Sequence, residues 1–132
     1  MLEKVRQSFQ GSPYWQLLGM RIEDAEPGSA RLALPHKKEL LQIYGQVHGG
    51  AIASLIDSAV AVALSLTLSP TEKATTVELK VNYLAPVRAG EIYAHSKIRK
   101  RGKTLIVGTT EVVDEAGILI AIATVTYMVL KV

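Results

Sequence analysis

The sequence predicts an α+β domain in which a curved antiparallel sheet wraps around one long central helix. An apolar run that opens at residues 48–50 and closes before Pro70 is too long for a strand, and its apolar residues repeat with helical spacing. From Thr76 onward the apolar residues instead alternate with polar ones, which is the period of a strand. The chain has 132 residues, of which 48% are hydrophobic, and this suits a single domain spanning residues 1–132.

Residues 1–19 are predicted to form an N-terminal helical segment that covers an edge of the domain or closes over it as a lid. The second helix of this segment is marked by Ser12 as the N-cap, by Pro13 at the first helical position and by Gly19 as the stop. Further along, the turn dipeptide at residues 27–28 separates two short strand-like pieces. A β-hairpin is therefore expected after the helices.

The long helix has two different faces, one apolar and one formed by small or polar residues. The apolar stripe contains Ile52, Leu55, Ala59, Val62 and Leu66, and the small or polar stripe contains Ser54, Asp57, Ala61 and Ser65. Burying an unpaired carboxylate costs several kcal/mol, on the order of the stability of a small domain. Asp57 therefore needs either a partner or a function.

Three further strands are expected, at about residues 91–100, 104–113 and 118–130. The segments between them, RKRGK and DEAG, are turn signals, and such short connections imply antiparallel neighbours. The last strand is partly apolar on both faces, as expected where one face meets the helix and the other a second subunit. One long helix against one curved sheet is the hotdog fold, and a ferredoxin-like fold with a second helix between strands is the alternative.

The composition argues against several classes of protein. A net charge of +3 is only mildly basic and few aromatic residues are available for stacking, so nucleic acid is not an expected partner. There is no cysteine and the spacing of the histidines resembles no metal site, so neither a metal nor a cofactor is expected.

Asp57 and nearby hydroxyls argue against a membrane span in residues 51–68. The N-terminus lacks the apolar core of a signal peptide, so a cytoplasmic protein is expected.

Gly49 and Gly50, at the start of the helix, are the first candidates for chemistry. The first N–H groups of a helix have no partner within it, so they offer donors and about half a positive charge to an oxyanion. The alternative is that the two glycines only permit a tight turn.

Asp57 lies eight residues beyond Gly49, about 12 Å along the helix axis and roughly 80° around it. If both residues act on one carbonyl, they come from different subunits of an obligate dimer.

Asp57 is the second candidate, because a carboxylate can attack a carbonyl carbon directly or take a proton from an attacking water. The structural alternative is that it only hydrogen-bonds Ser54, Ser58 or a neighbouring backbone group. The small-residue stripe beside it leaves room for a thin substrate. His48 is expected either to hydrogen-bond the loop that shapes the Gly49 donor or to have a purely structural role.

Three segments of the chain resemble the PaaI-like branch of hotdog-fold acyl-CoA thioesterases: GQVHGGAIASLIDSAVAVAL, TTVELKVNYLAPVRAGE and RKRGKTLIVGTTEVVDEAGILIAIATVTY. The similarity covers nearly the whole chain from about Tyr14. The resemblance implies hydrolysis of a short-chain or aryl acyl-CoA to free acid and CoA. It also implies that Asp57 is the nucleophile or general base and that a Gly49 amide from the other subunit binds the thioester oxygen.

The same resemblance implies roles for further residues. Gln42 would place its amide near the carbonyl or the water, and Thr76 would help to orient the water. Arg101 and Lys103 would face the nucleotide end of CoA. The other residues expected to contact the substrate are His48, Gly50, Ser54 and Ala61. Members of this family are usually dimers of dimers, so a homotetramer is expected.

Two other functions stay open at this point. A hotdog-fold hydratase or dehydratase would pair His48 with a carboxylate, although the surrounding sequence lacks the proline-rich histidine motif of hotdog dehydratases. A non-catalytic acyl-CoA or small-ligand binding protein would use Asp57 only to orient its ligand.

Overall fold

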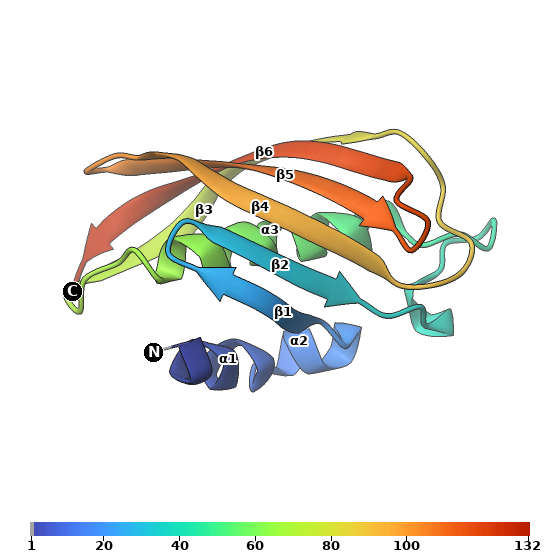
Figure 1. Ribbon diagram of the computed structural model, residues 1–132, viewed down its shortest axis with the longest axis horizontal. Helices are drawn as coiled ribbons and strands as arrows, with labels where there is room; N and C mark the ends of the chain where they lie inside the picture. Colours follow the sequence, from blue (N-terminus) through green and yellow to red (C-terminus); the bar gives the residue numbers. More distant parts are fainter. Residues whose placement is uncertain (1) are drawn as a thin grey trace.

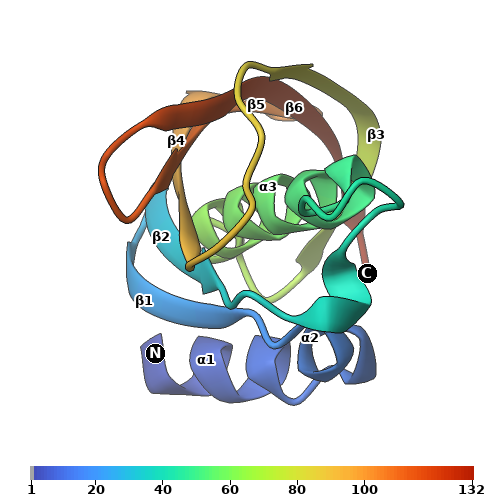
Figure 2. The same cartoon turned by 90° about the vertical axis from the view of Figure 1, so that its right-hand side faces the viewer.

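The computed structural model describes residues 2–132 and confirms the α+β hotdog fold (Figure 1). One antiparallel sheet of six strands, in the order β1-β2-β4-β5-β6-β3, curves around helix α3 (Gly49–Ser65) (Figure 2). The strands are β1 (Arg21–Glu26), β2 (Ser29–Leu34), β3 (Glu72–Tyr83), β4 (Ile92–Arg101), β5 (Leu105–Asp114) and β6 (Leu119–Lys131). Within residues 2–132, α3 is the one long helix between strands, so the ferredoxin-like alternative is wrong.

Two short helices precede the sheet, as predicted. They are α1 (Leu2–Gln10) and α2 (Pro13–Leu18), and both lie beside β1 (Figure 2). Gly19 ends α2 with a φ of 78°, a left-handed conformation that glycine adopts without steric cost. The predicted N-cap, Ser12, is extended as expected, but its side chain makes no capping hydrogen bond.

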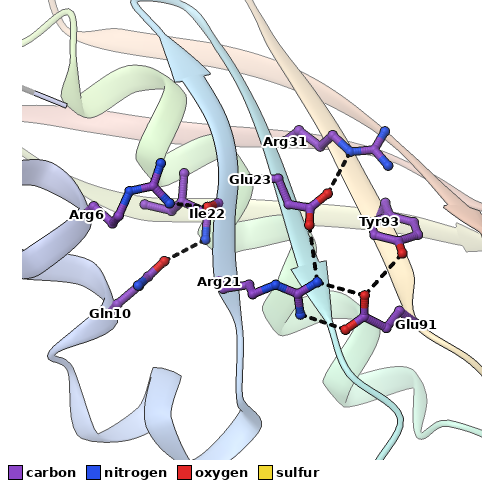
Figure 3. Close-up of polar contacts among 8 residues, drawn as sticks. All are labelled: Arg6, Gln10, Arg21, Ile22, Glu23, Arg31, Glu91 and Tyr93. Carbon is purple, nitrogen blue, oxygen red and sulfur yellow. Dashed lines mark hydrogen bonds and ion pairs between the residues drawn. The ribbon is translucent and has the colours of Figure 1, made fainter. Parts of the chain in front are cut away.

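Side chains of α1 satisfy the open edge of β1. The Gln10 side-chain oxygen accepts a hydrogen bond from the Ile22 amide at 2.8 Å, and Arg6 donates to the Ile22 carbonyl (Figure 3). An uncovered edge strand would be free to pair with another chain. The N-terminal segment therefore covers this edge of the sheet.

The strand order differs from the chain order at β3. As predicted, β4, β5 and β6 are consecutive antiparallel neighbours, whereas β3 pairs with β6 at the other edge of the sheet. β3 starts at Glu72, ahead of the alternating pattern, and has a bulge between Thr76 and Glu78. Its register places Thr76 opposite Tyr127 of β6. This non-local pairing builds part of the candidate site.

Helix α3 packs its apolar face mainly against β2 and β4. Leu55, Ile56 and Val60 are fully buried there. A Cβ atom at Gly108 of β5 would lie 2.9 Å from Val60 Cγ1, so a glycine lets the helix approach the sheet closely. Among residues 2–132, no helix combines the length and apolar character that crossing a bilayer requires.

A charged network covers the other face of β1, β2 and β4. Arg21 makes two hydrogen bonds to Glu91, at 2.6 and 2.8 Å, and contacts Glu23, which also pairs with Arg31 (Figure 3). The Arg31 guanidinium lies 4.4 Å from the centroid of the Tyr93 ring. The hydrogen bond between Arg21 and Glu91 raises the pKa of the guanidinium and lowers the pKa of the carboxyl. This network joins three neighbouring strand segments on the face away from α3.

Candidate active site

The start of α3 leaves one backbone donor free. His48 is the N-cap, and its Nδ1 accepts a hydrogen bond from the Gly50 amide at 2.8 Å, which assigns the ring proton of neutral His48 to Nε2. The amides of Ala51 and Ile52 donate to the His48 carbonyl. Within residues 2–132, the Gly49 N–H donates to no acceptor. An unpaired N–H at the positive end of a helix is a ready donor to an oxyanion.

Gly49 is held in place by Tyr83, the last residue of β3. The Tyr83 hydroxyl donates to the Gly49 carbonyl at 2.7 Å, and a Cβ atom at position 49 would lie 3.2 Å from Tyr83 Cζ. Partial burial raises the pKa of Tyr83, so its hydroxyl stays a donor in neutral solution. A side chain at position 49 would therefore crowd the Tyr83 ring, a packing effect that the sequence analysis of the two glycines did not include.

The loop before α3 orients Gln42. The Gln42 Oε1 atom accepts hydrogen bonds from the amides of Tyr44 at 2.5 Å and Gln46 at 3.3 Å. These two donors assign the oxygen to the loop and leave the Nε2 hydrogens free to bind another acceptor. Gln42 and Gly49 line one open cavity of about 370 Å³, together with Gln46, Val47, Ile52, Tyr83, Leu84, Ala85, Pro86 and Val87. The structure thus brings two free N–H donor groups to one cleft.

Asp57 lies in the middle of α3, half-buried, and two hydroxyl groups hold it. Thr76 Oγ1 donates to Asp57 Oδ1 at 2.9 Å, and the Tyr127 hydroxyl donates to the same oxygen at 2.6 Å and to the Asp57 carbonyl at 3.0 Å. These bonds offset the cost of placing a carboxylate in an apolar helix. Neither Ser54 nor Ser58 hydrogen-bonds the carboxylate, so its partners differ from the two serines considered in the sequence analysis.

The second oxygen of Asp57 is free. Within residues 2–132, Oδ2 has no hydrogen-bond partner, and no fully buried side-chain oxygen or nitrogen lacks one. Oδ2 is therefore accessible to solvent. It is the atom of this carboxylate that a water molecule or a substrate can reach.

The cleft and the carboxylate lie at different places along α3. Asp57 is not among the residues that line the cleft with Gly49, in agreement with the eight-residue separation of about 12 Å. Ser54, between them, donates to the Gly50 carbonyl and bonds the Tyr14 hydroxyl of α2 at 2.6 Å. One chain therefore holds both groups but does not direct them to one carbonyl.

The remaining predicted residues are dispersed. Ala61 is half-buried one helical turn beyond Asp57. Arg101 donates to Glu72 at 2.6 Å and to the Gly102 carbonyl at 2.7 Å, so its two terminal nitrogens are engaged, whereas Lys103 is exposed in the turn that follows. Of the two basic residues expected to meet CoA, Lys103 is the more available in the chain.

Two tyrosines of the candidate site, Tyr83 and Tyr127, were not predicted from the sequence. Tyr127 alternates with the buried residues Val125 and Val129 on the core side of β6. A buried phenol requires a hydrogen-bond partner. That requirement was the signal in the sequence, but the identity of the partner depends on how β6 packs against α3.

The curved sheet, its central helix and the groups along that helix define a hotdog-fold enzyme. The sequence profile of the thioesterase superfamily matches residues 44–121, and the chain belongs to this superfamily. It is a thioesterase of the PaaI-like hotdog type, as the resemblance predicted.

Individual relatives agree with this assignment. The chain is 33% identical to the medium/long-chain acyl-CoA thioesterase YigI of Escherichia coli (strain K12), with 89% of this chain and 85% of YigI covered. The crystal structure of the phenylacetic acid degradation protein PaaI of Thermus thermophilus, determined for a mutant, has a TM-score of 0.82 and 28% identity, over 89% of this chain and 98% of that one. Thioesterase HI1161 of Haemophilus influenzae has a TM-score of 0.91 at 23% identity, over 99% and 91% of the two chains, and supports the fold.

Proposed function

We propose that this protein hydrolyses the thioester of a short-chain or aryl acyl-CoA, at sites shared between the subunits of a homodimer. The observation that carries the proposal is the pair of unused groups on α3. One is the Gly49 N–H, which has no acceptor within residues 2–132, and the other is the solvent-accessible Asp57 Oδ2. A thioester carbonyl needs a donor for its oxygen and a base or nucleophile near its carbon.

The reaction needs no group beyond those described. The Gly49 N–H and the Gln42 amide bind the carbonyl oxygen and stabilise the oxyanion as it forms. Asp57 Oδ2 takes a proton from a water whose oxygen bonds to the carbonyl carbon, and collapse of the intermediate breaks the C–S bond and releases CoA as its thiolate. In the nucleophilic variant, Oδ2 bonds to the carbon and the C–S bond breaks to release CoA as its thiolate; water then hydrolyses the mixed anhydride to the free acid and regenerates Asp57. Both routes give the free acid and CoA.

The dimer explains how groups about 12 Å apart act on one carbonyl. β3 is an edge strand of twelve residues, and Val77 and Tyr83 on it are 52% and 51% exposed. An exposed strand edge of this length is suited to pairing with the same edge of a second copy. Such pairing brings the start of α3 from one copy toward the Asp57 of the other, and the two equivalent sites follow from the two-fold symmetry.

The small side chains along α3 support a thin acyl group, and the exposed Lys103 supports contact with the phosphates of CoA. We extend the proposal to a cytoplasmic dimer of dimers that uses no metal or other cofactor. A hydratase would require His48 and a carboxylate at one carbon, but His48 Nδ1 accepts a hydrogen bond from the Gly50 amide as the N-cap of α3.

Thiol release tests the proposal directly. Because the chain contains no cysteine, a thiol reagent detects released CoA without background from the protein. Purified protein is expected to release CoA from short aliphatic or aryl acyl-CoAs, and Asp57→Asn to lose at least about a hundredfold in rate. Glu111→Gln, an exposed carboxylate on β5, is the matched control and should keep the wild-type rate. The proposal is contradicted if no CoA is released from any ester tested, or if the protein instead hydrates a 2-enoyl-CoA. Saturable binding of the esters without turnover would indicate a binding protein.

Mixing inactive variants tests the shared site. Gly49→Ala and Asp57→Asn chains are each expected to be inactive as homodimers. In a mixed dimer of the two, one site combines the intact Gly49 with the intact Asp57, so co-expression at equal levels should recover about a quarter of wild-type activity. If each site lies within one chain, no recovery occurs.

A further inference from the structure

Tyr127 has no role in the proposed steps of hydrolysis, although it contacts Asp57 directly. It is 6% exposed on β6, and its hydroxyl donates to two oxygens of one residue, Asp57 Oδ1 and the Asp57 carbonyl. Burial, and after it the hydrogen bond to Asp57, raise the pKa of Tyr127. The phenol is therefore protonated in neutral solution and acts as a donor.

Thr76 reaches the same carboxylate oxygen from the neighbouring strand. Thr76 and Tyr127 are cross-strand partners in the β3–β6 register, and their hydroxyls converge on Oδ1 at 2.9 and 2.6 Å. A carboxylate that accepts only one hydrogen bond from the protein can still rotate about its side-chain torsions. Two donors from two strands fix its rotamer, and the direction of Oδ2 is then defined.

We propose that Tyr127 is a positioning residue for thioester hydrolysis: with Thr76 it holds Asp57 through Oδ1, so that Oδ2 is the atom that takes the proton from water or attacks the carbonyl carbon. This inference rests on the proposed function. Tyr127 also bonds the Asp57 backbone carbonyl, so it aligns the helix and the side chain at once. The phenol acts through Asp57 and does not contact the substrate.

Removing one oxygen atom tests the role. Tyr127→Phe keeps the ring in the core and is expected to lower kcat about tenfold to a hundredfold, because a catalytic group misplaced by 1 Å can lose that much. KM should stay within about twofold, since Tyr127 makes no contact with substrate. Tyr93→Phe is the matched control: its hydroxyl bonds the carboxylate of Glu91 at 3.1 Å, on the face of the sheet away from α3 (Figure 3), and its loss should leave kcat unchanged.

A double mutant separates positioning from a general structural effect. If Tyr127 acts through Asp57, the Asp57→Asn/Tyr127→Phe protein should be no slower than Asp57→Asn alone. If the double mutant instead loses kcat by the same factor that Tyr127→Phe costs in the wild-type background, the inference is overturned. It is also overturned if Tyr127→Phe alone keeps the wild-type kcat or changes only KM. If Asp57→Asn is impaired while Tyr127→Phe is not, the proposed function stands and only the inference fails. If the wild-type protein releases no CoA, both fail.

A second pair of variants covers the case in which Tyr127→Phe does not fold. Thr76→Val removes the other donor to Oδ1, and Thr76→Ser retains it. The inference expects Thr76→Val to lose about tenfold or more in kcat and Thr76→Ser to recover most of it. Equal rates for Thr76→Val and the wild-type protein show that Oδ1 need not be held, and overturn the inference.

Discussion

The Tyr83 hydroxyl donates to the Gly49 carbonyl across 2.7 Å, and a Cβ atom at position 49 would lie 3.2 Å from Cζ of the Tyr83 ring. One aromatic residue at the end of β3 therefore contacts the first residue of α3. The proposed donor to the thioester oxygen is the amide of that same glycine. The end of β3 therefore holds the residue that carries this donor. A change in either residue should affect both stability and catalysis.

Gly49→Ala should displace the helix start. Its Cβ atom would lie 3.2 Å from Tyr83 Cζ, so the ring or the helix start must shift by a few tenths of an ångström. We expect about a hundredfold loss in kcat, because an impaired oxyanion donor loses much of the hundredfold to thousandfold that such a donor typically contributes. Thioester hydrolysis assays and thermal unfolding check this together. Tyr83→Ala removes the clash, so Gly49→Ala should destabilise the Tyr83→Ala protein less than the wild type; equal destabilisation in both backgrounds contradicts the explanation.

Gln42→Glu distinguishes the role of the Gln42 side-chain oxygen, which bonds the loop, from that of its N–H donors. A glutamate oxygen can still accept from the Tyr44 and Gln46 amides, so the loop should keep its conformation. The N–H donors are lost, and a lost oxyanion donor typically costs about a hundredfold to a thousandfold in kcat. The melting temperature should therefore stay near that of the wild type while kcat falls. Gln42→Ala, which loses the loop bonds as well, should lower both, and a fully active Gln42→Glu enzyme excludes the donor role.

Glu72 should make stability depend on pH in the acid range. It accepts from the Ser69 amide, Lys131 and Arg101, and these contacts, with the Ser69 hydrogen bond the largest, lower its pKa from 4.5 to about 2. Because the pKa is lower in the folded state, the stabilisation is complete above about pH 4.5 and is lost as the pH falls toward about 2.

The matched variant is Glu72→Gln. Its melting temperature should lie below that of the wild type at pH 7, and the difference should shrink between about pH 4.5 and 2, where the wild-type carboxylate becomes protonated. Thermal unfolding at a series of pH values measures this. A difference that is the same at pH 7 and pH 3 would show that the charge of Glu72 does not stabilise the fold.

Gly108→Ala should overpack the contact between β5 and α3. The added Cβ atom would lie 2.9 Å from Val60 Cγ1 and 3.3 Å from the Lys97 carbonyl, and inserting a methyl group into a close-packed core typically costs about 1–3 kcal/mol. Urea denaturation gives the change in the free energy of unfolding. In a Val60→Ala background the penalty should be smaller, because the methyl group enters space that Val60 filled; strict additivity of the two changes contradicts this account.

Local sequence pattern was sufficient for most of the fold. The helical repeat from Ile52 to Leu66, the alternation after Thr76 and the turn signals each depend on neighbours in the chain, so they predicted α3 and the β4–β5–β6 meander correctly. Gly49 and Asp57 were also identified locally, as a helix start and as a charge in an apolar helix. The family followed from the same segments.

Long-range packing supplied what the pattern did not contain. The pairing of β3 with β6 brings Thr76 next to Tyr127, residues far apart in the chain, and their common target on Asp57 follows from the way that sheet wraps the helix. The same holds for the Tyr83 bond to Gly49 and for the pairing of Arg101 with Glu72. Periodicity reports which face of an element is buried, but a hydrogen bond needs two atoms within about 3 Å, and that distance is set by the folded chain.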